Sequence, residues 1–152
     1  SECRRNPVQG HRDRCWRFGD DGGMNSTENN GFIAAWERSK PFLVDALAHT
    51  GSHTVDDVLE EVEEGSAQFY PVRDGAAVFK IGEYPQKRVL LIWLYGGEMA
   101  SNIEGVLEAA EFHAEQLECA ELMIVGRRGW ERVLKPHGFA HQGVVLTKGI
   151  GG

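Results

Sequence analysis

The dominant pattern in the chain is an apolar run, followed by two glycines and then by a helical repeat. Residues 89–95 read VLLIWLY, an unbroken apolar run rich in β-forming residues and as long as one buried strand. Gly96-Gly97 interrupts this run. Apolar residues then recur at spacings of three and four from residue 103 to residue 117, so one face of a helix is apolar. The pattern predicts a buried strand, a glycine turn and a long helix over residues 88–118.

The start of this long helix carries a capping signal. Ser101-Asn102-Ile103-Glu104 fits a capping box, in which Ser101 and Glu104 bond to free backbone amides. The amides and dipole at a helix start also favour an anion, so the glycine turn is a candidate phosphate site. A capped structural helix is the alternative, because both side chains occupy amides that a phosphate needs.

Two helical patterns precede the strand. Residues 32–36 are expected to form a short strand or the first turn of a helix, and Pro41 suits the first position of a helix that Gly51 ends. Thr54 is the expected cap of a second helix, which ends at Gly65. The acidic residues over 56–64 are interpreted as a solvated helix face rather than a cation site.

Short strands surround the central pattern. Residues 67–72 and 76–81 are predicted strands joined by a turn at Asp74-Gly75, and residues 82–86 form a second turn. A strand over 121–126, a helix from Arg128 to about Lys135 and a last strand over 139–148 follow. The crossover between residues 89 and 125 implies parallel neighbours. The expected fold is a one-domain α/β sandwich, with helices on both faces of a mixed sheet.

Composition refines this picture. Residues 1–23 show no period, so we expect a flexible N-terminal extension or leader there and one domain over 24–152. Sixteen basic against 23 acidic residues argue against nucleic acid or an anionic membrane as a partner, and no apolar run is long enough to cross a bilayer. Cys3, His11 and Cys15 fit no zinc spacing, so no metal is predicted. An odd number of cysteines and the lack of a signal-peptide pattern favour a reducing, intracellular setting.

The predicted element order resembles the GCN5-related N-acetyltransferase (GNAT) superfamily over residues 32–148. The strand Val89–Tyr95 lies where this family has the strand before its acetyl-CoA loop, and Gly138-Phe139 resembles the Gly-Phe after its penultimate helix. The resemblance implies a GNAT-like, mostly antiparallel twisted sheet with helices on both faces, and acetyl-CoA as the cofactor.

A closer resemblance is to a small GNAT-like group associated with bacteriophages, including part of some podophage internal virion proteins. It is carried by Tyr84-Pro85, Arg88-Val89, Gly96-Gly97, Gly126-Arg127-Arg128-Gly129-Trp130 and Leu134. This resemblance implies phage structural proteins or a second copy of the chain as partners. It also implies a location in the host cytoplasm or in the virion.

The candidate cofactor-binding residues lie at two places. The resemblance points to Leu94, Tyr95, Gly96 and Gly97 at the acetyl-CoA loop, and the carboxyl edge of the strand over 121–126 adds Arg127 and Arg128. The family loop usually reads Gln/Arg-x-x-Gly-x-Gly/Ala, whereas this chain has Gly96-Gly97-Glu98-Met99-Ala100-Ser101. Glu98 and Glu104 would lie near the pyrophosphate, and each repulsion is on the order of a few kcal/mol. The loop therefore departs from the family pattern.

The catalytic positions depart from it as well. Counting back from Gly138, the tyrosine that protonates the CoA thiolate in many GNAT enzymes falls on Leu134. The remaining candidates for accepting a proton from an amine, directly or through water, are Glu83, Glu98 and His137. Cys119 is not favoured as a nucleophile, because no basic partner is evident.

Arg127-Arg128 at a helix start opposes the helix dipole. These arginines are candidates for a phosphate or carboxylate clamp with Trp130 as a stacking surface. The alternative pairs an arginine with Glu98 or Glu131 and buries Trp130. Among other side chains, Trp36 and Trp93 are expected in the core, His113 on a helix surface, and His137 and His141 beside the turn at 136–138.

Three functions remain open from the sequence. The favoured one is a GNAT-fold phage accessory or virion protein without acetyl transfer. The second is an active acetyl-CoA-dependent N-acyltransferase on an unknown amine. The third is a small-ligand or protein-binding module that uses residues 127–130.

Overall fold

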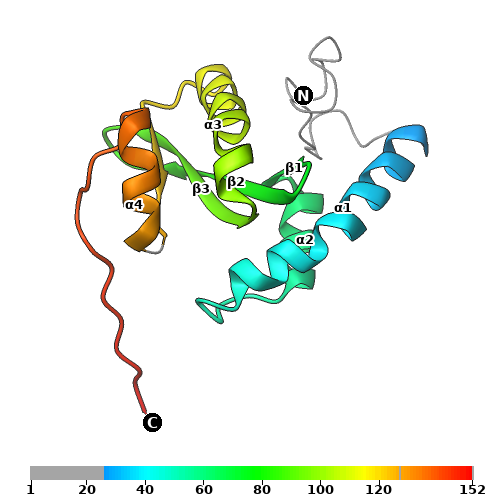
Figure 1. Cartoon of the computed structure of the whole chain (residues 1–152), viewed down its shortest axis with the longest axis horizontal. Coiled ribbons are helices and arrows are strands. Elements are labelled where there is room, and N and C mark those ends of the chain that lie inside the picture. Colours follow the sequence, from blue (N-terminus) through cyan, green and yellow to red (C-terminus); the bar gives the residue numbers. More distant parts are fainter. Residues whose placement is uncertain (1–25, 127, 152) are drawn as a thin grey trace.

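A computed structural model describes residues 26–126 and 128–151, and Figure 1 shows how the elements are arranged. Along the chain the elements are α1 (Ser26–Leu47), α2 (Val55–Glu64), β1 (Gln68–Val72), β2 (Gly75–Glu83), β3 (Arg88–Gly97), α3 (Met99–Gln116), β4 (Glu121–Ile124), α4 (Arg128–Leu134) and the 3-10 turn η3 (Lys135–His137). No helix in this described part of the chain is long and apolar enough to cross a membrane. The predicted extension over 1–23 lies outside the described residues.

The described strands form one sheet in the order β1-β2-β3-β4. β1 pairs with β2 and β2 with β3 in antiparallel fashion, while β3 and β4 are parallel. α3 covers one face, and α1 and α2 lie on the other (Figure 1). The predicted meander, crossover and mixed, mostly antiparallel sheet with helices on both faces are confirmed.

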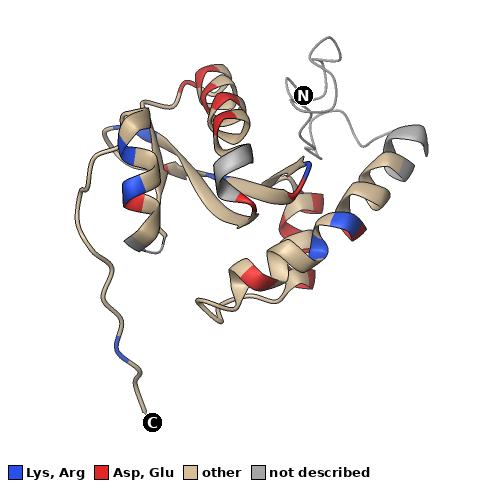
Figure 2. Ribbon diagram, in the orientation of Figure 1, with Lys and Arg blue, Asp and Glu red and all other residues tan. Residues whose placement is uncertain are grey.

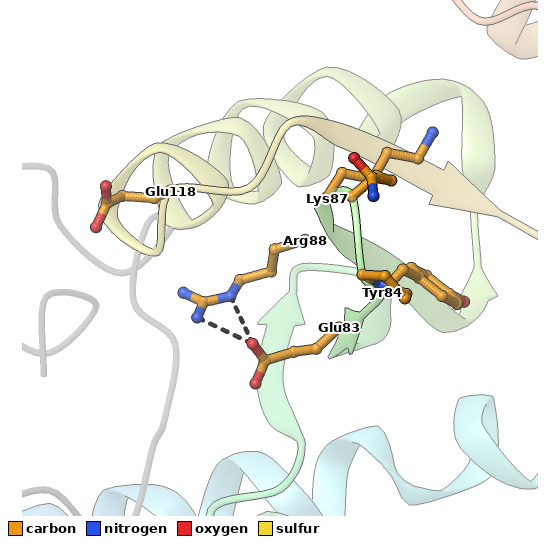
Figure 3. Close-up of a pocket in the computed structure, with 7 residues that line it drawn as sticks. Glu83, Tyr84, Lys87, Arg88 and Glu118 are labelled. Atoms are coloured by element: carbon orange, nitrogen blue, oxygen red, sulfur yellow. Dashed lines mark hydrogen bonds and ion pairs between the residues drawn. The ribbon is translucent and has the colours of Figure 1, made fainter.

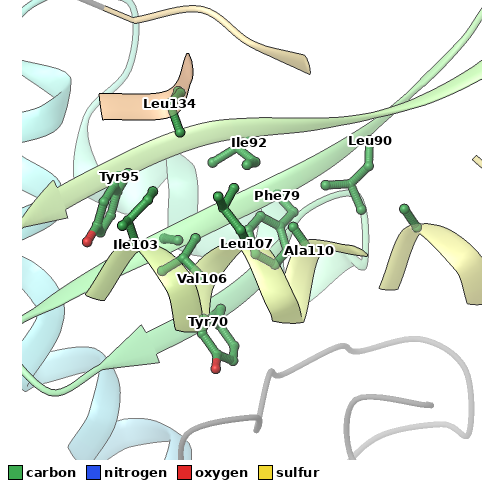
Figure 4. Close-up of a cluster of buried hydrophobic side chains, with 12 residues drawn as sticks. Tyr70, Phe79, Leu90, Ile92, Tyr95, Ile103, Val106, Leu107, Ala110 and Leu134 are labelled. Atoms are coloured by element: carbon green, nitrogen blue, oxygen red, sulfur yellow. The ribbon is translucent and has the colours of Figure 1, made fainter. Parts of the chain in front are cut away.

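The core on the α3 face is built as the helical repeat predicts. Ile103, Val106, Leu107 and Ala110 project from one side of α3 onto the strands, where Phe79 and its neighbours meet them (Figure 4). His113 also lies on this stripe, seven positions after Val106, and is fully buried beside the Phe79 ring. The expectation of a surface His113 is therefore wrong, because its position in the helical repeat places it toward the sheet.

The second core lies under α1 and α2 and is rich in aromatic rings. Phe32 and Trp36 pack against Phe69 of β1, so Trp36 is in the core as predicted, whereas Trp93 is only partly buried. α1 runs through residues 32–36 without a strand and continues past Pro41. Pro41 is thus inside the helix and not at its start. Buried residues before it and after it, including Leu43 and Leu47, hold α1 against the sheet on both sides of the proline.

The two predicted helix caps have different outcomes. Thr54 caps α2 as expected: the Asp57 amide donates to Thr54 Oγ1 at 3.1 Å and the Thr54 amide donates to Asp57 Oδ2 at 2.8 Å. α3, however, begins at Met99, so Ser101 is inside the helix and the predicted cap there is wrong. The Asn102 side chain instead donates to the Glu98 carbonyl at 2.9 Å.

The end of the chain differs from the sequence prediction. Gly138 ends η3 with a left-handed conformation, and Phe139 packs partly against the core. Residues 140–151 form no strand, and their described side chains are exposed. The predicted strand over 139–148 is therefore wrong for the isolated chain. Residues 140–143 carry little apolar surface to draw the segment back to the sheet.

Candidate functional site

The middle of β3 contains a β-bulge. Val78 of β2 faces Leu94 and Phe79 faces Ile92, so Trp93 is an extra residue in β3. Trp93 and Leu94 consequently both lie on the α1 and α2 side, while Ile92 packs on the α3 side. The bulge changes the direction of the side chains in the second half of β3.

β3 and β4 separate beyond this point. Their pairing ends at Ile92 and Ile124, whereas β3 continues to Gly97. A cleft of about 330 Å³ opens between them. β3 lines it with Leu91, Trp93, Leu94 and Tyr95; α1 and the loop after it with Ala46, His49, Thr50 and Ser52; and the segment after β4 with Val125, Gly126 and Trp130. Most of this lining is apolar, so the cleft suits an uncharged or apolar group.

Trp130 and Tyr95 form one wall of the cleft. Their ring centroids are 5.9 Å apart at an interplanar angle of 60°. A Cβ on Gly126 would come within 2.5 Å of the Trp130 ring, so glycine is what allows the indole to lie against the backbone. The Tyr95 hydroxyl donates to the Glu98 carbonyl at 2.9 Å. Burial, with a smaller contribution from the Glu98 carboxylate, raises the pKa of Tyr95 to about 12 and keeps the phenol neutral.

The glycine turn at the end of β3 is closely packed by backbone. A Cβ on Gly96 would lie 2.1 Å from the Phe42 carbonyl oxygen of α1, and one on Gly97 would lie 2.2 Å from the Asp74 carbonyl oxygen. Gly97 also has a φ of +111°, which favours glycine. The next amide, of Glu98, donates to the same Asp74 oxygen at 3.0 Å. The turn is thus built for close packing against two carbonyl groups.

A series of polar side-chain contacts starts at Ser52, on the border of the cleft. Ser52 Oγ lies 2.8 Å from His53 Nδ1, and His53 Nε2 lies 3.4 Å from Glu61 Oε2. Lys80 Nζ pairs with Glu61 Oε1 at 2.8 Å and lies 4.1 Å from the centroid of the Trp93 ring. Residues 48–53 show no hydrophobic period, so sequence reasoning does not point to Ser52 and His53. Two histidines and two hydroxyl residues over 48–53 are the sign in the sequence that points to this loop.

The structure brings some of the predicted cofactor residues together. Leu94 and Tyr95 line the cleft, and Gly96 and Gly97 follow directly at its end. Arg127 and the side chain of Arg128 lie outside the described residues. The predicted arginine clamp therefore stays a prediction. Trp130, the predicted stacking surface, is half-buried in the cleft wall.

The three candidate bases are not brought together. Glu98 is exposed next to the glycine turn, and His137 is exposed in η3. Glu83 is far from the glycine turn. Gly75 pairs with Gly97 at one end of β2 and Glu83 lies at the other end, about 26 Å away at the rise of a strand. Leu134, at the position of the family's tyrosine, is 2% exposed in the α3-face core.

Glu83 lies in a second, open and polar depression of about 360 Å³ (Figure 3). Its carboxylate accepts from Arg88 Nε at 3.2 Å and from Arg88 Nη2 at 3.0 Å, and Arg88 Nη1 donates to the Leu117 carbonyl at 2.7 Å. Half-buried Cys119 is close to the same arginine, and burial raises the pKa of its thiol while Arg88 opposes the rise. These contacts tie the end of α3 to the β2–β3 turn, which is a structural role.

No family model and no curated protein sequence matches the chain. Solved structures do match. A probable acetyltransferase aligns with a TM-score of 0.61 at 10% identity, over 78% of this chain and 93% of that one. The ribosomal-protein-alanine N-acetyltransferase from Brucella melitensis biovar Abortus 2308 gives 0.58 at 12% identity, over 78% and 95%. The chain has a GNAT-like fold. A predicted acetyltransferase with acetyl-CoA from Clostridium acetobutylicum gives a TM-score of 0.52 at 12% identity, over 84% of this chain and 93% of that one.

The structural similarity establishes the GNAT-like fold. At such low sequence identity it does not establish an activity or a substrate. Within this fold, β3 is the strand that the sequence resemblance places before the acetyl-CoA loop, and it borders the apolar cleft. Among the described residues, no group of three or more His, Cys, Asp or Glu side chains is placed to hold a metal ion. Cys3, His11 and Cys15, for which the sequence predicts no metal, lie outside the described residues.

Proposed function

We propose that the chain is a GNAT-fold accessory protein that does not transfer acetyl groups. The observation that carries the proposal is the packing of the glycine turn. Gly96 and Gly97 face the carbonyl oxygens of Phe42 and Asp74, and the Glu98 amide is already bonded to Asp74. A CoA pyrophosphate needs free amides and meets repulsion from carbonyl oxygens. The close packing of this turn, with the Glu98 amide already bonded, supports a turn without a phosphate-binding role.

The position of Leu134 supports the same proposal. The resemblance places a proton-donating tyrosine there, and the structure has a leucine side chain in the α3-face core. Tyr95, which does line the cleft, uses its hydroxyl to hold the Glu98 carbonyl. Its pKa of about 12 makes it a poor proton donor at neutral pH, because catalysis favours groups with pKa values near the working pH.

An N-acyltransferase is the second candidate. The polar contacts that link Ser52, His53 and Glu61 beside the cleft favour it. If Glu61 accepts from the Nε2–H of a neutral His53, Nδ1 is left to accept from the Ser52 hydroxyl. A proton from an amine at the cleft would then pass through Ser52 to His53. This arrangement supplies a base, but the Glu98 amide at the glycine turn is already bonded to Asp74 and is not available to a phosphate, so the enzyme ranks below the first candidate.

Titration calorimetry with acetyl-CoA, together with thiol release measured over a panel of amines, separates the two candidates. The accessory protein should give no binding heat up to millimolar acetyl-CoA and no release above background. Micromolar binding would overturn the non-catalytic proposal. An enzyme should in addition lose turnover in His53→Ala and keep it in His141→Ala, a matched exposed histidine outside the cleft.

We propose a bacteriophage as the setting, with the chain as an accessory or virion component in the host cytoplasm or the particle. The sequence motifs around Tyr84 and over residues 126–130 support this. Mass spectrometry of gradient-purified particles from the source phage tests the virion form. The protein should remain with the particles at a fixed ratio to their structural proteins after a high-salt wash. Recovery in the soluble lysate alone would contradict that form.

A further inference from the structure

The loop between α1 and α2 (Figure 1) places a hydroxyl, an imidazole and a carboxylate in series. Ser52 Oγ lies 2.8 Å from His53 Nδ1, and His53 Nε2 lies 3.4 Å from Glu61 Oε2 of α2. A hydroxyl next to a base, with the base oriented by a carboxylate, is the arrangement that activates a serine for attack on an acyl carbon. It is recognised by these contacts on unrelated folds and not by positions in the sequence.

Neighbouring side chains hold the imidazole and the carboxylate in place. The His53 ring stands edge-on to the Trp93 ring, with centroids 4.9 Å apart and an interplanar angle of 74°. Lys80 Nζ pairs with the other oxygen of Glu61, Oε1, at 2.8 Å and lies 4.1 Å from the centroid of the same Trp93 ring. Glu61 Oε2 is thus the oxygen directed at His53. With Nε2 protonated toward this oxygen, Nδ1 has a lone pair for the Ser52 proton.

The Ser52 hydroxyl has a second polar neighbour. Thr50 Oγ1 lies 3.2 Å from Ser52 Oγ, and either hydroxyl can be the donor. When Thr50 donates, Ser52 Oγ accepts this bond and keeps its own proton for His53. Ser52 is exposed, and both hydroxyl residues line the cleft between β3 and β4. The oxygen that His53 can deprotonate is therefore open to a small molecule in the cleft.

We propose that Ser52 is the nucleophile of an ester-hydrolysing site, with His53 as its general base and Glu61 as the residue that positions the base. The substrate is an uncharged ester of a short carboxylic acid, and its acyl group lies in the cleft. Leu94 and Trp130 belong to the apolar lining, and the volume of about 330 Å³ suits a small group. The activity goes beyond the accessory role and needs no acetyl-CoA, because water accepts the acyl group.

The reaction has two steps, which share one proton carrier. Ser52 Oγ bonds to the ester carbonyl carbon while its proton moves to His53 Nδ1. The ester C–O bond then breaks, and the leaving alcohol takes that proton. In the second step water adds to the acyl carbon and gives a proton to His53, and the Ser52 oxygen leaves and takes this proton. The products are a carboxylic acid and an alcohol, and both side chains return to their starting state.

Labelling of the full chain with an uncharged alkyl fluorophosphonate tests the nucleophile directly. An activated serine bonds to the phosphorus of this probe with loss of fluoride, and peptide mass spectrometry should find the adduct on Ser52. His53→Ala should slow the labelling by about a hundredfold or more, the usual contribution of a positioned base. Ser66→Ala is the matched control and should label like the wild type. Ser66 is also exposed and near Glu61, but its Oγ donates to the Glu61 backbone carbonyl at 3.2 Å.

Release of p-nitrophenol from p-nitrophenyl butyrate tests turnover. It should be lost in Ser52→Ala and kept in Ser66→Ala. Glu61→Gln should lower kcat by about tenfold or more and leave KM unchanged, because Glu61 contacts the base and is not part of the cleft lining. A rise in KM with an unchanged kcat would show that Glu61 shapes the cleft and does not position His53.

The covalent adduct separates this proposal from its alternatives. A hydroxyl that only relays a proton, as in the acyltransferase candidate, would give no adduct, and a wild type without an adduct on Ser52 would overturn the proposal. Hydrolysis that persists in Ser52→Ala would overturn it as well, because the imidazole of His53 would then be acting on the activated ester without a serine nucleophile. Neither result depends on acetyl-CoA binding, so the accessory role is tested separately.

Discussion

Individual side chains in this molecule take their properties from a few close neighbours. Tyr95 illustrates this, because burial raises its pKa and its hydroxyl bridges back to the Glu98 carbonyl at the start of α3. Asp57 is another example: the amide and side chain of Thr54 lower the pKa of its carboxyl, although it is exposed. Short-range hydrogen bonds can thus be anticipated from sequence, whereas burial effects require the fold.

Tyr95 gives a prediction about alkaline pH. A folded-state pKa near 12, above the ordinary value of 10.0, means that Tyr95 stabilises the folded state fully below pH 10. That contribution is lost as the pH rises from 10 through 12. Absorbance at 295 nm should show one tyrosine ionising near pH 12, and Tyr95→Phe should remove this component. The exposed Tyr84 offers a control, since Tyr84→Phe should leave it in place. An unchanged high-pH titration in Tyr95→Phe would contradict the assignment.

The differences between sequence and structure at residue level follow the same division. The Thr54–Asp57 cap could be predicted because both partners lie within three residues. The burial of His113 could not, since a polar residue type outweighed its place in the helical repeat. Residues 48–53 carry no pattern, and the contacts that link Ser52, His53 and Glu61 depend on how α1 and α2 pack against the sheet.

At the level of elements, the end of β3 is fixed by its packing against α1 and the β1–β2 turn. Gly96→Ala places a methyl group against the Phe42 carbonyl, which belongs to the backbone and cannot rotate away. We expect this change to lower the free energy of unfolding by about 1–3 kcal/mol. Urea denaturation followed by circular dichroism measures the loss.

Gly105 provides the matched control for Gly96. It lies within α3, and a Cβ there meets nothing within 4 Å. Gly105→Ala should therefore raise the free energy of unfolding by about 0.5–1 kcal/mol, because alanine loses less entropy than glycine in a helix. Equal effects from the two substitutions would show that the Gly96 contact is not the cause of the loss.

Element boundaries show where local signals stop being sufficient. The hairpin at residues 73–74 and the α2 caps formed as their short motifs predict. α3 starts two residues before its capping motif, because Glu98 bonds back to Asp74 and ends the strand there. The bulge at Trp93 had no sequence sign, since a continuous apolar run looks the same with or without an extra residue.

For the whole molecule, the distribution of charge follows the layers of the fold. Acidic residues gather on α2 and α3, and α4 carries both basic and acidic residues (Figure 2). This agrees with the interpretation of the 56–64 run as a solvated face. The fold class and strand order could be predicted because helix and strand periods were clear. The cleft could not, because it arises where two non-adjacent segments, β3 and the residues after β4, diverge.

The order of strands in the sheet has a consequence for how the molecule folds. Each strand neighbours the next one in the chain, so the contacts of β1, β2 and β3 close only short loops. Such local pairings form quickly, since little chain entropy is lost in bringing them together. The β3–β4 pairing must wait for α3, which lies between them in the chain. The sheet can therefore grow in the direction of synthesis, with β4 as the last strand to join and its outer edge as the growing end.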